Sequence, residues 1–339
     1  MSSSYVSMQN LSLAYGKTVV VPDLDLDIRK GELIALLGPS GCGKTTTMRA
    51  IAGLMTPQSG HISIDGKDVT RTPANKRGIG LVFQSYALFP HLNAFENVAF
   101  GLRLKKLPKS EITARVEHGL KTVGLPHLAE RKPAEMSGGQ QQRLSLARSL
   151  VMEPKVLLLD EPLSNLDARL RLDMRTELQR VQRDTGITMV FVTHDQSEAL
   201  ALADRIVLMK DGKIEQLDTP DNLYNRPATK FAADFFGFEN IFEVSGSDLI
   251  GPSGQVPTTF KAENGHLAWR PGAVNVGSGP YNGIVCGVAF AGEQREYVID
   301  AELGQIKASV PTTDKLFELG ATVAFDLPQA GALPLPAQS

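Results

Sequence analysis

The chain has 339 residues, enough for two or three domains, and its 42% hydrophobic and 21% charged residues are typical of a globular protein. Its 35 Lys and Arg nearly balance its 37 Asp and Glu, so the net charge of −2 gives no basic excess that would indicate nucleic acid or an anionic membrane surface as a partner. We expect no membrane-spanning segment, because no apolar run reaches about 18 residues, and the widely spaced Cys42 and Cys286 fit a reducing compartment.

The larger, N-terminal part of the chain alternates predicted strands with predicted helices. Strands are expected at 5–15, 18–28, 32–37, 61–69, 156–159, 189–192 and 206–209. Helices are expected at 45–53, 168–184 and about 196–204, and helical spacing over 92–152 is broken at Pro108, 124–126 and Pro133. This alternation predicts an α/β fold with a mainly parallel sheet.

The composition changes after about Gly237. Glycine and proline become frequent, long helical patterns end, and short alternating runs occur at 266–270, 283–290, 296–301 and 305–310. These features predict a small all-β domain, barrel-like in form. We therefore expect a first domain over 1–236, a second over 237–330 and a flexible tail over 331–339.

A glycine-rich loop follows the predicted strand at 32–37. It satisfies the pattern G-x-x-x-x-G-K-[ST], in which backbone N–H groups surround phosphates, the lysine reaches the β and γ oxygens and the hydroxyl binds Mg²⁺. Its position between a strand and a helix supports a nucleotide site. The residues expected to bind the nucleotide here are Gly38, Ser40, Gly41, Cys42, Gly43, Lys44, Thr45 and Thr46.

Two acidic residues end the apolar strand at 156–159. Asp160 is expected to hold Mg²⁺ through water, as in phosphate-loop enzymes generally. Glu161 stands one residue further, where it would orient and polarise an attacking water. An ordinary acidic turn is the alternative, and the phosphate loop upstream disfavours it.

Three further residues, Gln84, His194 and Tyr15, are candidates for the site, but each taken alone indicates a function less strongly than the two motifs above. Gln84 follows a strand and is expected to touch the metal or the water, while His194 follows the strand at 189–192 and is expected to bond a γ-phosphate. Tyr15 lies at a hairpin tip, where it would stack on adenine. A solvated glutamine, a structural histidine and an ordinary core or surface aromatic are the alternatives, and only the surrounding pattern favours the functional interpretation.

Ser137, Gly138, Gly139 and Gln140 begin a predicted helix and form a second loop suited to an anion. The hydroxyl and successive backbone N–H groups converge at a helix N-terminus, where the partial positive charge lies. Because the phosphate loop at 38–46 is already complete, the second loop indicates a nucleotide shared between two copies of the chain.

These motifs, taken in order, resemble a known family. Tyr15, GPSGCGKTT, Gln84, MSGGQQQR, LLLDEP, the SNLD of 164–167 and Thr193-His194-Asp195 are similar to the motifs of ATP-binding cassette ATPases of membrane transporters, over residues 1 to about 236. The resemblance implies a P-loop NTPase fold, with a RecA-like core, an antiparallel β subdomain and a helical insertion at about 90–153. Met136 departs from the family's usual Leu, an apolar exchange of similar volume.

The resemblance also implies roles for individual residues. Glu161 would be the catalytic base, His194 the residue that senses the γ-phosphate, and Gln84 would join Thr45 and Asp160 at the metal.

The same resemblance implies a homodimer that encloses two Mg-ATP. In it, the ATP held by one subunit would be covered by Ser137, Gly138, Gly139 and Gln140 of the other. Asp167 would lie in the loop that links the two sites. The segment 84–92 would form the groove that receives a short helix from a transmembrane permease subunit, and nucleic acid is not an expected partner.

The C-terminal part resembles the regulatory domain, of oligonucleotide-fold type, that is found in importers. Residues 267–271, LAWRP, are similar to its hydrophobic-Arg-Pro motif, although Gly272 stands where an acidic residue is usual. The resemblance implies an importer with separate permease subunits and, indirectly, a solute-binding protein. The chain would then lie at the cytoplasmic face of the cell membrane, peripheral through the permease.

The solute stays open at this stage. Residues 236–242, FGFENIF, favour the polyamine, iron and opine branch, so the sequence predicts a small polar or charged solute such as a polyamine, with ferric iron, an opine, a phosphonate or a sugar as alternatives. A soluble cassette ATPase of ribosomes or DNA is the alternative class, disfavoured by a single uninterrupted cassette without heptads. In a third interpretation, residues 238–339 sense a ligand or an inhibitory protein.

Overall fold

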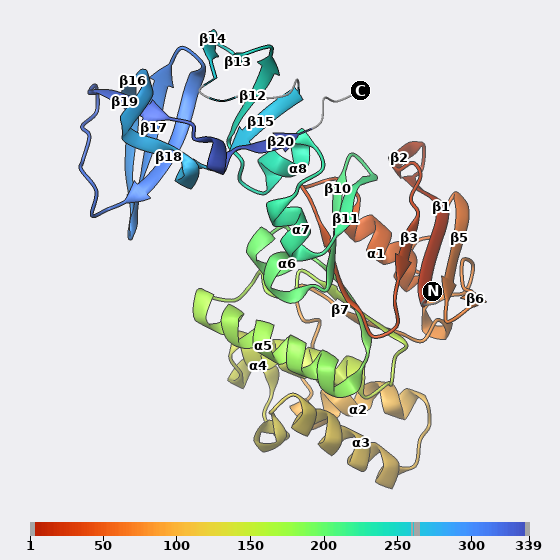
Figure 1. Ribbon diagram of the computed structural model, residues 1–339. Coiled ribbons are helices and arrows are strands. Elements are labelled where there is room, and N and C mark those ends of the chain that lie inside the picture. Colours follow the sequence, from red (N-terminus) through yellow and green to blue (C-terminus); the bar gives the residue numbers. More distant parts are fainter. Residues whose placement is uncertain (1–3, 259, 261–264, 336–339) are drawn as a thin grey trace. The chain divides into compact units, whose positions relative to one another are not determined.

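The computed structural model describes residues 4–258, 260 and 265–335. Its contacts divide the chain into two compact units, Met1–Pro220 and Asp221–Ser339 (Figure 1). In the described residues, every helix is too short or too polar to cross a membrane.

A six-stranded sheet forms the centre of the first unit, as the sequence predicts. Its strands β4, β7, β8, β9 and β10 run parallel and β11 is antiparallel at one edge. In spatial order the strands are β11 (Lys213–Asp218), β10 (Arg205–Lys210), β4 (Leu33–Leu37), β9 (Thr188–Val192), β8 (Val156–Asp160) and β7 (Ile79–Val82). All five residues of β4 and of β9 are buried, which explains why these strands are continuous apolar runs rather than alternating ones.

A second, antiparallel sheet packs into the same core. Its strands are β1 (Val6–Tyr15), β2 (Thr18–Val21), β3 (Leu26–Ile28), β5 (Ser59–Ile64) and β6 (Lys67–Asp68). The sequence predicts one strand over 18–28 and one over 61–69, and this is wrong, because the structure has two separate strands in each segment. In the second case the chain turns at Asp65 and Gly66, both at positive φ of 54° and 71°, a conformation that ends a strand.

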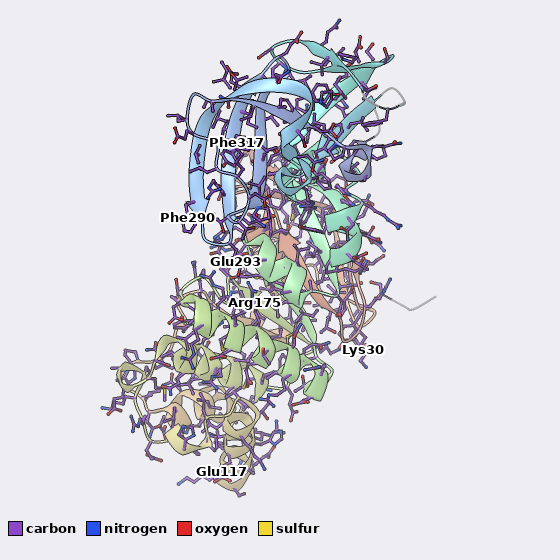
Figure 2. The ribbon with its side chains drawn as sticks, turned by 60° about the vertical axis from the view of Figure 1, so that its left-hand side comes forward. Lys30, Glu117, Arg175, Phe290, Glu293 and Phe317 are labelled. Carbon is purple, nitrogen blue, oxygen red and sulfur yellow. The ribbon has the colours of Figure 1, made fainter. Side chains whose placement is uncertain are left out.

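The helices of the first unit fall into two groups. Helices α1 (Lys44–Ala52), α5 (Ala168–Thr185) and α6 (Gln196–Leu202) follow strands of the central sheet, and Arg175 of α5, labelled in Figure 2, donates a hydrogen bond of 2.8 Å to Ser197 of α6. Helices α2 (Ala94–Leu104), α3 (Lys109–Thr122) and α4 (Gly138–Leu150) pack on one another and form a helical layer at one end of the unit (Figure 1). This layer is the predicted helical insertion.

The second unit is rich in β structure, as predicted. One sheet joins β14 (Gln255–Pro257), β13 (Asp248–Ile250), β12 (Asn240–Ser245), β15 (Gly265–Trp269) and β20 (Leu333–Leu335), and the other joins β18 (Gly304–Pro311), β17 (Gln294–Ala301), β16 (Asn275–Ala291) and β19 (Thr322–Asp326). Side chains of both sheets share one core, in which Trp269 is fully buried. Phe290 and Glu293 lie at the end of the β16–β17 hairpin (Figure 2).

The division between the units comes earlier in the chain than the boundary predicted at 236. Helices α7 (Pro220–Asn225) and α8 (Lys230–Phe235) belong almost entirely to the second unit, and Arg270 binds α7 and the residue that follows α8. The Arg270 guanidinium donates hydrogen bonds to the carbonyl of Phe236 and, at 2.6 Å, to that of Tyr224. The same group lies over two aromatic rings, 3.7 Å from the centre of Tyr224 and 4.2 Å from the centre of Phe238.

The predicted flexible tail over 331–339 needs a correction. Residues Leu333–Leu335 form β20, which pairs antiparallel with β15, and Leu335 is buried. The alternation of leucine with proline in this segment allows an edge strand, where a missing N–H can face outward. Residues 336–339 lie outside the described part of the chain.

Candidate active site

The predicted catalytic motifs meet at one edge of the central sheet. Strands β4, β7, β8 and β9 are parallel, so the segments that follow them all leave from their carboxyl ends. The register aligns Asp160 with Val192, Val192 with Leu36, and Val82 with Leu159. The phosphate loop, Gln84, Glu161 and His194 therefore all begin at the same edge.

The phosphate loop, residues 38–45, leads directly into the N-terminus of α1. The Lys44 ammonium is buried inside the loop and donates to the carbonyls of Gly38 at 2.7 Å and Pro39 at 2.8 Å. Gly43 caps the helix with a positive φ of 101°, and no acidic residue lies in the first turn, so the helix dipole faces the loop uncompensated. This geometry suits an anion.

Close packing explains Gly38 and Gly43, two of the three glycines of the loop. A methyl group at Gly38 would overlap the carbonyl of Met209, and one at Gly43 would lie 2.8 Å from Val21. Cys42 is only 4% exposed and packs into the core, and its sulfur accepts a hydrogen bond from the Lys44 ammonium at 3.7 Å. Ser40 and Gly41 are exposed, and Thr45 and Thr46 lie in the first turn of α1.

Asp160 and Glu161 stand side by side at the end of β8. Burial raises the pKa of the Asp160 carboxyl, the neighbouring charge of Glu161 raises it further, and Arg49 opposes both. Glu161 has a positive φ of 44°, an uncommon conformation for a glutamate, and its N–H donates to Val192 at 3.0 Å.

Gln84 and His194 both bind the Glu161 carboxylate. The Gln84 amide donates to Glu161 Oε2 at 3.2 Å and to the Ser164 hydroxyl at 3.1 Å. The His194 Nδ1 lies 3.2 Å from Glu161 Oε1, and 61% of the His194 side chain is exposed. Asn165 fixes the Gln84 backbone by donating to its carbonyl at 2.9 Å. The three residues predicted as catalytic therefore form one hydrogen-bonded group.

Tyr15 lies at the end of β1 and is 50% exposed, so its ring is free to stack on a ligand. Its hydroxyl accepts a hydrogen bond from Arg49 of α1 at 3.3 Å. This hydrogen bond is the largest cause of the lowered pKa of the Tyr15 phenol, and a hydrogen bond with Thr46 is the second. The tyrosine is thus connected to the helix that follows the phosphate loop.

The loop Ser137–Gln140 caps α4. The Ser137 hydroxyl accepts from the Gln140 N–H at 3.3 Å, and the Gln140 side chain accepts from the Ser137 N–H at 2.9 Å. A methyl group added at Gly138 would lie 3.6 Å from Leu166 and 3.7 Å from the Tyr86 hydroxyl. In the described residues, the neighbours of the loop thus belong to the segments after Gln84 and Glu161, and not to the phosphate loop of the same chain.

Asp167 caps α5 and is exposed. Its carboxylate accepts from the Leu170 N–H at 2.9 Å. The residue directly before it, Leu166, is buried, and its side chain would lie 3.6 Å from a methyl group placed at Gly138, so Asp167 is near the Ser137 loop in the first unit.

The segment after Gln84 is held in a strained conformation by residues that the sequence interpretation missed. Tyr86 and Ala87 have positive φ values of 62° and 48°. The Arg148 guanidinium of α4 donates to the Ala87 carbonyl at 2.7 Å and to the Tyr86 carbonyl at 3.0 Å, and the Ser145 hydroxyl donates to Tyr86 at 2.9 Å. The buried Asn97 side chain binds both the N–H and the C=O of Phe89.

The chain is similar to known proteins along most of its length. The family model described as "ABC transporter" matches residues 21–164. The Fe(3+) ions import ATP-binding protein FbpC of Rhizobium etli is 49% identical over 89% of this chain and 89% of its own. The spermidine/putrescine import ATP-binding protein PotA of Thermobifida fusca is 55% identical over 70% of this chain and 62% of its own.

The chain belongs to the ABC transporter family. It is the ATP-binding subunit of an ABC importer and hydrolyses ATP. Among solved structures, cbiO1 from Clostridium perfringens, part of the ABC transporter complex cbiONQ, is 32% identical with a TM-score of 0.62 and covers 66% of this chain and 91% of its own. An ATP-binding cassette solved as a dimer with ADP and phosphate after hydrolysis is 33% identical with a TM-score of 0.56, and the match covers 63% of this chain and 98% of that chain.

The strained segment of this ABC importer ATPase yields a prediction. Arg148→Ala removes the donors that hold Tyr86 and Ala87, so we expect faster amide hydrogen exchange within residues 84–92 and a loss of about 1–3 kcal/mol of unfolding free energy. Arg143→Ala, on the same helix, is the control, because its side chain makes no such bond to that segment. Unchanged hydrogen exchange over 84–92 in Arg148→Ala would show that the hydrogen bonds from Arg148 do not hold this segment in place.

Proposed function

We propose that this ATPase works as a homodimer that encloses two ATP molecules between the phosphate loop of one copy and the Ser137–Gln140 loop of the other. The observation that carries the proposal is the position of that second loop. It is a helix N-terminus built for an anion, yet its neighbours, Leu166 and Tyr86, belong to other segments than the phosphate loop of its own chain. A second copy, turned by a two-fold axis, would supply the missing wall of each site.

The residues present fit a magnesium ion. Thr45, Gln84 and Asp160 offer the oxygen atoms that Mg²⁺ prefers, and the half-buried Asp160 beside Glu161 has a raised pKa that a nearby cation would lower again. These three residues would hold Mg²⁺, which would supply positive charge to offset that of the ATP phosphates. As the pH falls toward the raised pKa of Asp160, protonation would compete with this binding.

The remaining chemistry belongs to the residues of the chain itself. Lys44 would exchange its loop carbonyls for phosphate oxygens, Tyr15 would stack on the adenine, and Glu161 would accept the proton of the attacking water. His194, which follows β9 and contacts Glu161, would exchange this contact for the γ-phosphate, and loss of the phosphate would let His194 return to Glu161.

The role of Glu161 can be tested by a nearly isosteric change. We expect Glu161→Gln to bind ATP with unchanged affinity but to lower turnover by about 100-fold or more, because a general base is lost while the shape of the site is kept. Gel filtration with ATP is then expected to show a dimer that retains nucleotide. Glu117→Gln, at an exposed position of α3 (Figure 2), is the control and should match the native chain. Normal turnover in Glu161→Gln would rule out Glu161 as the base.

We also infer how hydrolysis reaches a membrane partner. Gln84 contacts Glu161, and the following segment, 84–92, is half-exposed and apolar, which suits a short helix of a transmembrane permease subunit. A change at the γ-phosphate would move Gln84 and hence this segment. The chain would then work at the cytoplasmic face of the membrane, peripheral through the permease and served indirectly by a solute-binding protein.

The β-rich second unit would regulate this cycle. Its LAWRP motif places the buried Trp269 in the core of the unit, and Arg270 donates hydrogen bonds to the carbonyls of Tyr224 and Phe236 within the same unit. We propose no catalytic role for it.

Ferric iron is the solute that we propose first, ahead of the polyamine that the sequence favoured. FbpC relatives match 89–96% of this chain, including the β-rich unit, whereas the PotA match covers 70% of it. The alternative of a soluble cassette ATPase on ribosomes or DNA finds no support among these relatives, which are importer subunits.

Uptake assays in a cell that lacks this chain would distinguish ferric iron from a polyamine as the solute. We expect this cell to lose uptake of radiolabelled iron(III) while keeping uptake of spermidine, and the native chain, but not Glu161→Gln, to restore the loss. A loss of spermidine uptake with normal iron uptake would overturn the choice of solute and leave the ATPase proposal intact.

A further inference from the structure

A cavity of about 640 Å³ lies at the edge of the central sheet opposite the candidate active site. Its lining includes Lys30 shortly before β4, Pro154 and Lys155 just before β8, and residues 185–188 at the start of β9. These strands are parallel and carry the nucleotide motifs at their carboxyl ends, so their amino ends define the far edge. The cavity is thus distinct from the nucleotide site.

The other wall of the cavity comes from the helical layer. Ala114, Arg115 and His118 of α3 line it, together with Leu150 at the end of α4 and the following Val151. The two helices are closely packed here, because a methyl group at Gly119 would overlap Val151. The cavity therefore bridges the central sheet and the end of the helix that begins at the Ser137 loop.

Some of the basic side chains around the cavity form ion pairs, and others do not. Lys155 is paired with Asp65 at 2.7 Å, and Arg115 with Glu111 at 2.8 Å and Glu153 at 3.1 Å. By contrast, the exposed Lys30 ammonium lies 5.7 Å from the centre of the Tyr5 ring, and in the described part of the chain neither it nor the exposed His118 forms a salt bridge. The Lys30 charge acts only at longer range on Asp65, whose pKa is lowered first by Lys155 and then also by Lys30. Figure 2 shows Lys30 at the surface of the first unit.

The rest of the lining is mainly apolar. Leu150, Val151, Pro154 and Ile187 contribute side chains that are buried or half-buried around the cavity. A concave, largely apolar site with a few polar groups at one side is the usual form of a small-molecule pocket, and the volume falls within the range of about 300–1,000 Å³ for such pockets.

We propose that this cavity binds a small amphipathic anion, with its one anionic group beside Lys30 and His118 and its apolar body against Leu150, Val151 and Ile187. A ligand there would contact both the central sheet and the end of α4. Since α4 has 13 residues and rises about 1.5 Å per residue, its two ends lie about 20 Å apart. A shift of α4 would carry the Ser137 loop with it, so the bound anion would change the rate of ATP hydrolysis.

The test uses 8-anilinonaphthalene-1-sulfonate as the probe, because it joins one sulfonate to an apolar aromatic body. Its fluorescence is titrated against the full chain with saturating ADP and Mg²⁺, which keeps the nucleotide site filled. We expect saturable binding by the native chain. The double variant Lys30→Ala with His118→Ala should raise the dissociation constant by about tenfold, and Ala114→Trp should remove the saturable signal by filling the cavity.

Lys121→Ala is the matched control, because it removes an exposed lysine from the same helix outside the cavity. It should bind the probe like the native chain, and thermal unfolding without the probe checks that every variant is folded. The probe should also change the ATPase rate of the native chain but not that of Ala114→Trp. Absence of saturable binding by the native chain, or equal binding by all variants, would overturn the proposal. A defect of the nucleotide site itself would appear separately, as a chain without turnover in the absence of the probe.

Discussion

The parallel alignment of β4, β9, β8 and β7 is the constraint on which the site depends. In a parallel sheet, strands far apart in the sequence end at the same edge, so the segments after residues 37, 82, 160 and 192 come together without any long loop. The buried apolar side chains of these strands fix the register. The polar residues that follow them can then be selected for chemistry, because the core already determines where they lie.

Several residues at this edge hold conformations that cost free energy. Glu161, Tyr86 and Ala87 all have positive φ, which side chains disfavour. At Tyr86 and Ala87 the cost is offset by hydrogen bonds from Arg148 and Ser145 on α4, the helix that Ser137 caps. One helix thus joins the loop proposed to meet the second copy with the segment proposed to meet the permease.

Motifs made of neighbouring residues were predictable from the sequence, whereas contacts between distant residues were not. The phosphate loop, Asp160 with Glu161, and the Ser137 cap each follow from local chemistry and a flanking strand or helix. Arg148 and Asn97 gave no such signal, since an arginine and an asparagine in amphipathic helices have many ordinary roles. The same limit applies to the boundary near Pro220, which depends on Arg270 reaching back to Tyr224, and to β20, whose pairing with β15 depends on a partner more than sixty residues away.

The central claim, that each active site is completed by a second copy, is tested most directly by mixing two inactive variants. Lys44→Ala damages the phosphate loop and Ser137→Arg damages the second loop, so each alone should be inactive. If the loops act across the dimer, a mixed dimer has one site with both loops intact, and the mixture should hydrolyse ATP faster than either variant alone. If both loops act within one chain, every chain in the mixture is defective, and an inactive mixture in which mixed dimers are shown to form would contradict the account.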